Sequence, residues 1–94
     1  MIERRGEVVL LAGGVTIGTV PGLVDAISEH LSQGAKQVDL SKVTEVDSSA
    51  VALLLEWQRQ AAGHGTTLNW TGVPAALQNL ANLYGVQELL PITV

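Results

Sequence analysis

The polar turn Asp47-Ser48-Ser49 holds the residues of this chain whose types and spacing best suit chemistry. It follows a strand-like apolar segment and precedes a long helix with an apolar stripe, so two hydroxyls lie at a helix N-terminus. Unpaired backbone N–H groups and the helix dipole favour an anion or an acceptor oxygen at such a place. The turn is therefore predicted to receive, hold or sense a phosphate, or simply to cap the helix.

Helix capping needs only one residue of this kind, an effect of about 1 kcal/mol. Three in a row leave spare polar groups at an exposed helix end, which favours a partner contact at Ser48. Ser48 and Ser49 are also the two candidate phosphorylation sites. A phosphoserine would be repelled by the carboxylate of Asp47 and attracted by the helix end.

The other chemical residue types argue against catalysis and against cofactors. The chain has no Cys, which excludes disulfides and thiolate metal ligands. His30 and His64 have no second ligand at metal spacing, so no metal site is expected. Neither histidine is placed to relay a proton to Ser48 or Ser49, and the Gly pattern of a nucleophile elbow is missing. We expect no enzyme activity, no catalytic residue and no cofactor.

The glycines Gly13, Gly14, Gly18 and Gly22 resemble a phosphate-binding loop only superficially. They lack the Gly-Lys-Ser/Thr ending and the strand-to-helix placement of that motif. Turn glycines explain them better.

Composition predicts one folded domain over residues 1–94 that works in the cytoplasm. With 47% apolar and 15% charged residues the chain can form a core. The net charge of −4 argues against nonspecific binding to nucleic acid or anionic membranes. Neither a signal peptide nor an apolar run long enough to span a bilayer is recognisable.

The apolar periodicity predicts an α/β domain in which a mixed sheet of four to five strands carries about three helices. Strands are expected over residues 7–12, 15–17, 37–40 and 66–70, with a short terminal strand in 86–92. The first two should pair through a turn at Gly13-Gly14. Helices are expected over residues 21–34, with Thr19 as a cap, over 49–62, and over 74–85.

The helix over residues 49–62 has two distinct faces. Its apolar stripe consists of Ala50, Leu53, Leu54, Trp57 and Ala61, and Glu56, Arg59 and Gln60 lie away from it. The last three form a candidate partner footprint beside Ser48, or simply a solvated face. Helical spacing places Trp57 and Tyr84 in the core, with interface anchors as the alternative.

Three segments of the chain resemble the STAS domain, a family named for sulfate transporters and anti-sigma factor antagonists. They are Val38-Asp39-Leu40-Ser41, then Val46-Asp47-Ser48-Ser49 running into an apolar helix, and the ending Leu89-Leu90-Pro91-Ile92. The resemblance covers nearly the whole chain and implies a STAS-like fold. Many STAS domains have Gly where this chain has Ala50, and Ala favours clean helix propagation.

Within the family the chain looks most similar to the small subunits of the Mla phospholipid transporter of Gram-negative bacteria. This resemblance implies a non-enzymatic subunit that docks on an ABC-transporter ATPase (MlaF-like) and, through it, on a permease (MlaE-like) at the inner membrane. The complex maintains outer-membrane lipid asymmetry. The expected partner-binding residues are Asp47, Ser48, Ser49, Val51, Leu55, Glu56 and Arg59.

The alternative implied by the family is an anti-sigma factor antagonist that switches partners when phosphorylated. Ser49 is then the preferred acceptor, because it holds the usual phosphosite position of the family. Both readings use the same turn.

Overall fold

The computed structural model describes residues 2–90 and 92–93. Its strands are β1 (Ile2–Arg5), β2 (Val8–Val15), β3 (Gln37–Val46), β4 (Asn69–Thr71) and β5 (Ile92–Thr93). Its helices are α1 (Val20–Leu23), α2 (Ile27–Ser32), α3 (Ser48–Gly63), α4 (Ala75–Leu83) and the 3-10 helix η1 (Gln87–Leu89). The predicted α/β class with a mixed sheet is confirmed.

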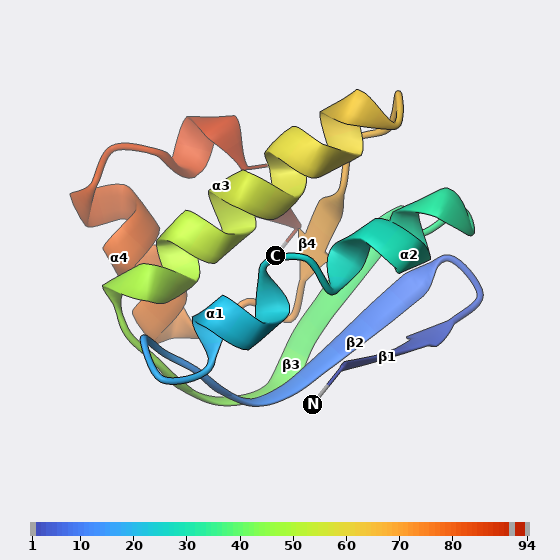
Figure 1. Ribbon diagram of the computed structural model, residues 1–94. Helices are drawn as coiled ribbons and strands as arrows, with labels where there is room; N and C mark the ends of the chain where they lie inside the picture. Colours follow the sequence, from blue (N-terminus) through green and yellow to red (C-terminus); the bar gives the residue numbers. More distant parts are fainter. Residues whose placement is uncertain (1, 91, 94) are drawn as a thin grey trace.

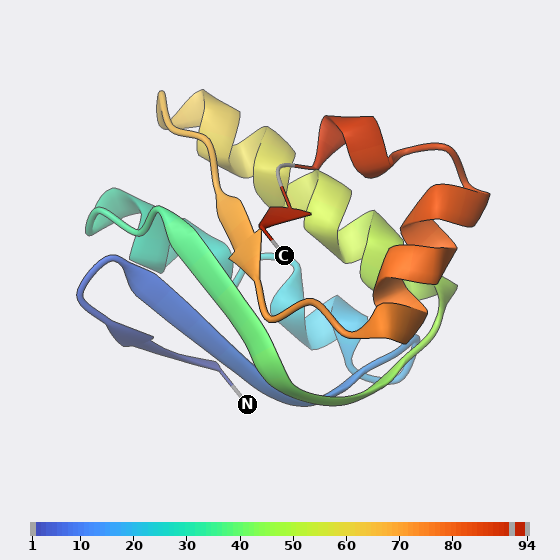
Figure 2. The same ribbon diagram turned by 180° about the vertical axis from the view of Figure 1, so that it is seen from behind.

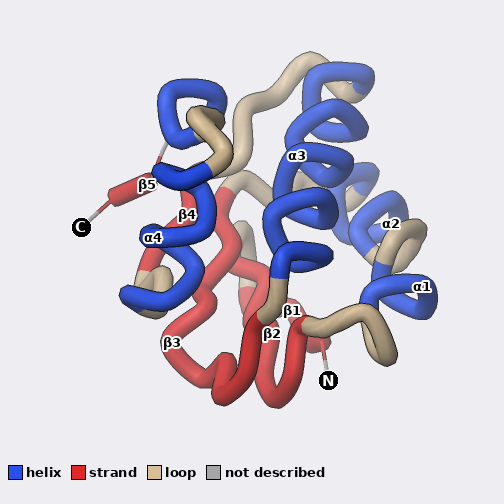
Figure 3. The backbone as a smooth tube through the Cα atoms, turned by 90° about the vertical axis from the view of Figure 1, so that its left-hand side faces the viewer, coloured by secondary structure: helices blue, strands red, loops and turns tan. Residues whose placement is uncertain are grey.

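The described strands form one sheet in the order β1-β2-β3-β4-β5. β1 is antiparallel to β2, and the remaining neighbours are parallel. Figures 1 and 3 show the helices gathered on one side of this sheet, and Figure 2 shows the strands from behind with α1 and α2 beyond them. No helix of the described part is long and apolar enough to cross a bilayer.

The parallel pairing of β2 with β3 decides where the two longest strands end. Val15 at the end of β2 pairs with Val46 at the end of β3. The segments that follow these residues therefore begin side by side at one edge of the sheet. One leads into α1 and the other into α3 (Figure 1).

The core lies between the sheet and the helices and is built mainly from aliphatic side chains. Trp57 of α3 stacks on Trp70 of β4, with ring centroids 6.3 Å apart and ring planes inclined by 18°. The predicted apolar stripe of α3 is confirmed, because all its members are buried: Ala50, Leu53, Leu54, Trp57 and Ala61.

The prediction of a core position is wrong for Tyr84, whose exposed fraction is 54%. Helical spacing from Leu77 and Ala81 would turn residue 84 inward if the helix continued. Instead α4 ends at Leu83 and Tyr84 is its C-cap residue.

The predicted hairpin through Gly13-Gly14 is also wrong. Both glycines lie inside β2, which runs without a turn to Val15 and pairs with β3 along its length. Two register shifts, one after Leu10 and one at Gly13/Gly14, absorb the irregularity that the sequence suggested as a turn. The antiparallel partner of β2 is β1, a strand with little apolar signal because Glu3, Arg4 and Arg5 make up most of it.

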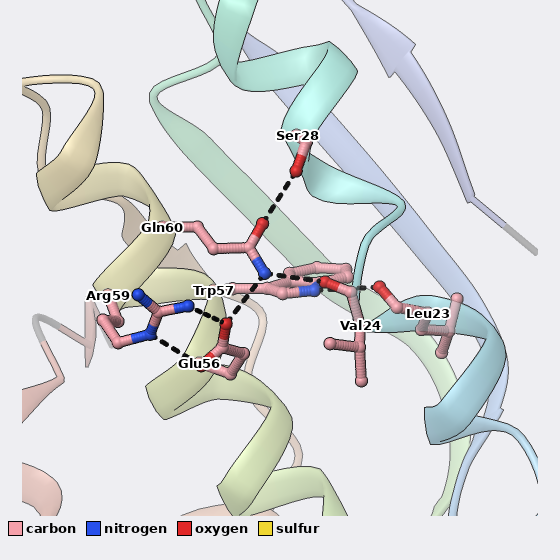
Figure 4. A network of polar contacts seen from close by, with 7 residues as sticks. All are labelled: Leu23, Val24, Ser28, Glu56, Trp57, Arg59 and Gln60. Carbon is pink, nitrogen blue, oxygen red and sulfur yellow. Dashed lines mark hydrogen bonds and ion pairs between the residues drawn. The ribbon is translucent and has the colours of Figure 1, made fainter.

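The helix predicted over residues 21–34 is broken into α1 and α2. In a continuous helix the N–H of Ser28 would bond to the carbonyl of Val24, but it donates to Asp25 at 3.2 Å. Two side chains of α3 take up carbonyls at the break: Trp57 Nε1 donates to Leu23 at 3.0 Å, and Gln60 Nε2 donates to Val24 at 3.0 Å (Figure 4). Tertiary hydrogen bonds thus replace intrahelical ones.

Other strand boundaries differ from the predicted ones. β3 extends to Val46, beyond the predicted end at residue 40, because its second half pairs with β2. The strand predicted over 66–70 is observed as Asn69–Thr71. Residues 87–89 of the expected terminal strand form η1, and β5 is confined to Ile92–Thr93. Pro91 lies outside the described residues.

The connection after β4 depends on Gly72. Its φ is +62°, and an added Cβ would lie 2.8 Å from both the backbone nitrogen and the Cβ of Ser41. We expect Gly72→Ala to lower the free energy of unfolding by about 2–5 kcal/mol, through backbone strain and steric overlap. Gly85→Ala is the matched control, since Gly85 has φ +68° with nothing within 4 Å of the added Cβ.

Urea unfolding followed by tryptophan fluorescence measures both variants. The control should lose only about 1–2 kcal/mol, the cost of the left-handed backbone alone. Equal losses in the two variants would show that the close approach to Ser41 costs nothing.

Candidate functional site

Asp47 is the N-cap residue of α3, at the point where β3 ends. Its backbone is extended (φ −135°, ψ −172°), and its Oδ1 accepts the N–H of Ser49 at 2.9 Å and the hydroxyl of Ser49 in a short hydrogen bond. The capping alternative from the sequence is therefore confirmed for Asp47. The cap consists of the carboxylate of Asp47 and the backbone N–H and hydroxyl of Ser49.

The second carboxylate oxygen of Asp47 reaches the segment after β2. Oδ2 accepts the backbone N–H of Ile17 at 2.9 Å, across 30 positions of sequence. The hydroxyl of Ser49 is the largest of the influences that hold the pKa of Asp47 below its ordinary value, and the N–H of Ile17 is the next. Asp47 is thus a carboxylate at neutral pH, and both of its oxygens accept hydrogen bonds. It is a poor general base, but it joins the start of α3 to the segment after β2.

The segment between β2 and α1 is compact, and Thr19 organises it. The Thr19 hydroxyl accepts the N–H of Thr16 at 3.0 Å and donates to the carbonyl of Gly14 at 2.9 Å. Two backbone bonds to the carbonyl of Thr16, from Thr19 and Val20, close the turn. Thr19 does precede α1 as its N-cap residue, but its side chain bonds back toward β2 and makes no cap hydrogen bond.

Ser48 and Ile17 are exposed at this edge, as is Thr19, whose hydroxyl bonds within its own turn. Ser48 is exposed, and among the described residues its hydroxyl has no hydrogen-bond partner. Ile17 has an exposed fraction of 77%, the same as that of Leu83. We call Ile17 and Ser48 together the loop edge.

Sequence reasoning missed Ile17, because the residue was assigned to the end of a strand. No local signal marks it, because Val15 two residues earlier gives Ile17 the alternation of a strand. The bond from Asp47 that fixes it could not be read from the sequence.

The remaining predicted contact residues divide between core and surface. Val51 lies in the core with 4% of its surface exposed, because it belongs to the inward face of α3, so it is left out of the surface proposed below. Leu55 is half-buried and packs against the core. Arg59 is exposed, three turns along α3 from Ser48.

Glu56 and Arg59 pair on α3 in a bidentate arrangement. Arg59 Nε donates to Oε1 of Glu56 at 2.8 Å and Arg59 Nη2 donates to Oε2 at 2.5 Å (Figure 4). Gln60 Nε2 also donates to Oε2, at 3.0 Å, and Gln60 Oε1 accepts the hydroxyl of Ser28 at 2.9 Å. Gln60 is thus a structural link between α3 and the α1–α2 break rather than a free surface amide.

The carboxyl of Glu56 gives this network a pH dependence. The hydrogen bond from Arg59, and after it the bond from Gln60, lowers the pKa of Glu56 from 4.5 to about 2. A depressed folded pKa adds stability above the unfolded value, and this stability is lost as pH falls from about 4.5 towards 2. We expect Glu56→Gln to lose less stability than wild type over this window, measured by urea unfolding at a series of pH values.

The other acidic groups serve as the internal reference for this prediction. Asp47 and Asp39 also have lowered pKa values and titrate in both proteins. Only the difference between wild type and Glu56→Gln therefore reports on Glu56. If the free energy of unfolding fell equally with decreasing pH in both proteins, the prediction would be contradicted.

Three solved structures with a similar fold are two anti-sigma factor antagonists and one sulfate transporter family protein, and these three are 14–21% identical to the chain. A proposed anti-sigma factor antagonist from Thermotoga maritima gives a TM-score of 0.77 at 14% identity, covering 98% of this chain and 83% of that one. The anti-sigma factor antagonist SpoIIAA in its unphosphorylated form gives 0.72 at 17% identity, covering 100% and 87%. A sulfate transporter family protein from Wolinella succinogenes gives 0.71 at 21% identity, covering 92% and 74%.

These likenesses establish the fold and no more. No curated protein sequence matches the chain significantly. The family comparison is more decisive, because the sequence model described as "Mlab, STAS domain" matches residues 2–91, nearly the full length. With its strand order, its helical layer and the Asp47-Ser48-Ser49 turn at the start of α3, the chain belongs to the STAS-domain family, in its MlaB type.

Proposed function

We propose that this chain is a non-enzymatic accessory subunit that binds and supports the ATPase of an ABC phospholipid transporter. The observation that carries the proposal is the loop edge, where Ser48, exposed and with a hydroxyl that has no partner among the described residues, follows Asp47, whose carboxylate bonds to the backbone of the exposed Ile17. Asp47 and Ser49 hold this edge in one conformation without contributing a free reactive group. Such a surface suits docking to another protein.

The surroundings of Ser48 support binding over catalysis. A nucleophilic serine needs a base within hydrogen-bond reach, and the oxygens of Asp47 are taken up by Ser49 and Ile17. His64 is the C-cap residue of the 16-residue helix α3, which places it about 24 Å from Ser48 by helix rise. His30 lies on α2.

The MlaB type of the domain supports the transporter reading over other docking roles. On this reading the partner is an MlaF-like ATPase, and an MlaE-like permease is reached through it. The chain is then cytoplasmic and peripheral to the inner membrane, and the complex maintains outer-membrane lipid asymmetry. The contact surface comprises Ser48 and Ile17, with Leu55 and Arg59 further along α3.

Ser48→Arg tests the position of the contact. A bulky cation on the loop edge should abolish co-purification of the ATPase with the tagged chain from detergent-solubilised cells of its own organism. The fold should survive, because Ser48 is exposed and its hydroxyl makes no bond within the described residues. Ser32→Arg is the matched control: Ser32 is an exposed serine of α2, at the opposite end of the helical layer (Figure 1).

Two results would contradict the proposal in different ways. Normal recovery of an ABC ATPase with Ser48→Arg would move the contact away from the loop edge. Recovery of no ABC ATPase with wild type would overturn the transporter function itself.

A second candidate function is an anti-sigma factor antagonist controlled by phosphorylation. It is favoured by one observation, the solvent-exposed hydroxyl of Ser48 at a helix N-terminus. The preferred acceptor from the family resemblance, Ser49, instead donates its hydroxyl to Asp47.

Intact-mass measurement on the chain isolated from its own cells tests this function. A phosphoserine adduct that changes with growth phase, together with recovery of an anti-sigma kinase, would establish the antagonist role. If the measured mass showed no phosphate in any growth phase, the antagonist function would be excluded. Peptide mapping of any adduct then separates Ser48 from Ser49.

A further inference from the structure

We infer that residues 16–24 form a strap that opens from the domain as one unit. Its front end is held at Ile17 by the carboxylate of Asp47, and its rear end is held by two side chains of α3. Because Ile17 belongs to the strap and Ser48 to α3, the loop edge exists only while the strap is closed. A partner that contacts both residues therefore binds the closed form alone. The inference goes beyond the proposed function and does not depend on it.

The first argument is that the strap contributes little to the core. The structure describes every residue from 16 to 24, and it buries none of them completely. The helix inside the strap, α1, spans four residues, far fewer than a helix needs to be stable by itself. Val20, Leu23 and Val24 are partly buried against the core, so apolar contact favours the closed position only weakly. A segment of this kind opens at a lower free-energy cost than the core does.

The second argument is that the rear end of the strap is fixed. Trp57 Nε1 donates to the carbonyl of Leu23, and Gln60 Nε2 donates to the carbonyl of Val24, both at 3.0 Å (Figure 4). Trp57 is completely buried. Breaking its hydrogen bond would either uncover the indole ring or leave the indole N–H without a partner, and both are costly. We call this end of the strap the anchor.

The front end of the strap depends on a bond that is easier to break. The N–H of Ile17 donates to Oδ2 of Asp47, while the N–H groups of Thr19 and Val20 both bond within the strap, to the carbonyl of Thr16. Ile17 is exposed and Asp47 is half-buried, so water can replace either partner when this bond breaks. The carboxylate of Asp47 is therefore the latch of the strap, and the strap opens about the anchor.

Amide hydrogen exchange of the purified chain, followed residue by residue by NMR, tests the strap. In Asp47→Asn the amide oxygen stays with Ser49, which donates two bonds to it, and the NH2 group cannot accept the N–H of Ile17. Exchange at Ile17 should become about tenfold faster or more. Val20 and Gly22 should show the same increase, although their N–H groups bond inside the strap and not to Asp47.

Two controls accompany this variant. The N–H of Ala26 bonds to the carbonyl of Leu23, at the anchor, and should exchange as slowly as in wild type. Asp39→Asn removes the same charge from β3, the strand that ends just before Asp47. The side chain of Asp39 accepts the N–H of Ser41 within that strand, so this variant should leave exchange in the strap unchanged.

Each contrary result overturns a separate part of the inference. Faster exchange at Ile17 alone would show the loss of one hydrogen bond without the opening of a unit. An equal increase at Ala26 would remove the anchor, and an equal increase throughout β2 and β3 would show lower global stability in place of strap opening. If Asp39→Asn had the same effect as Asp47→Asn, loss of charge would explain both and the latch would be wrong. The ATPase takes no part in this experiment, so its outcome is independent of the proposed function.

Discussion

The carboxylate of Asp47 is the interaction on which the site depends. It caps α3 with one oxygen and fixes the segment after β2 with the other. This double use is available only because β2 and β3 are parallel and end together at Val15 and Val46. The same geometry accounts for the free hydroxyl of Ser48, since the neighbouring acidic and hydroxyl groups already satisfy each other. Parallel pairing, helix capping and the exposed loop edge are therefore three aspects of one arrangement.

Much of the fold could be predicted from periodicity and capping residues, and the errors have a shared cause. The apolar stripe of α3 and the alternation of strands and helices depend on local patterns, and they were found. The single strand through Gly13-Gly14 and the break between α1 and α2 depend on distant partners, β3 in one case and Trp57 with Gln60 in the other. A local pattern cannot reveal a hydrogen bond formed across more than thirty residues.

The candidate site shows the same division. The turn Asp47-Ser48-Ser49 was recognisable, because carboxylate and hydroxyl residues before an apolar stripe mark a helix start. Which of the three would remain exposed was not, since this depends on the hydrogen bonds that Asp47 makes. Helical spacing alone could have removed Val51 from the predicted partner-binding residues, because it shares the inward face of α3 with Leu54 and the rest of the apolar stripe. The link that Gln60 makes to the α1–α2 break could not be read from the sequence, because it joins residues more than thirty positions apart.

The bond between Asp47 and Ile17 also has a consequence for the assembly of the sheet. A slip of one residue between β2 and β3 would turn their side chains to the wrong faces and would carry Asp47 away from the N–H of Ile17. The β2–β3 pair contains two register shifts and so has more than one nearby alignment to reject. The loop edge forms only in the correct alignment, so the bond from Ile17 to Asp47 favours the native register over its neighbours.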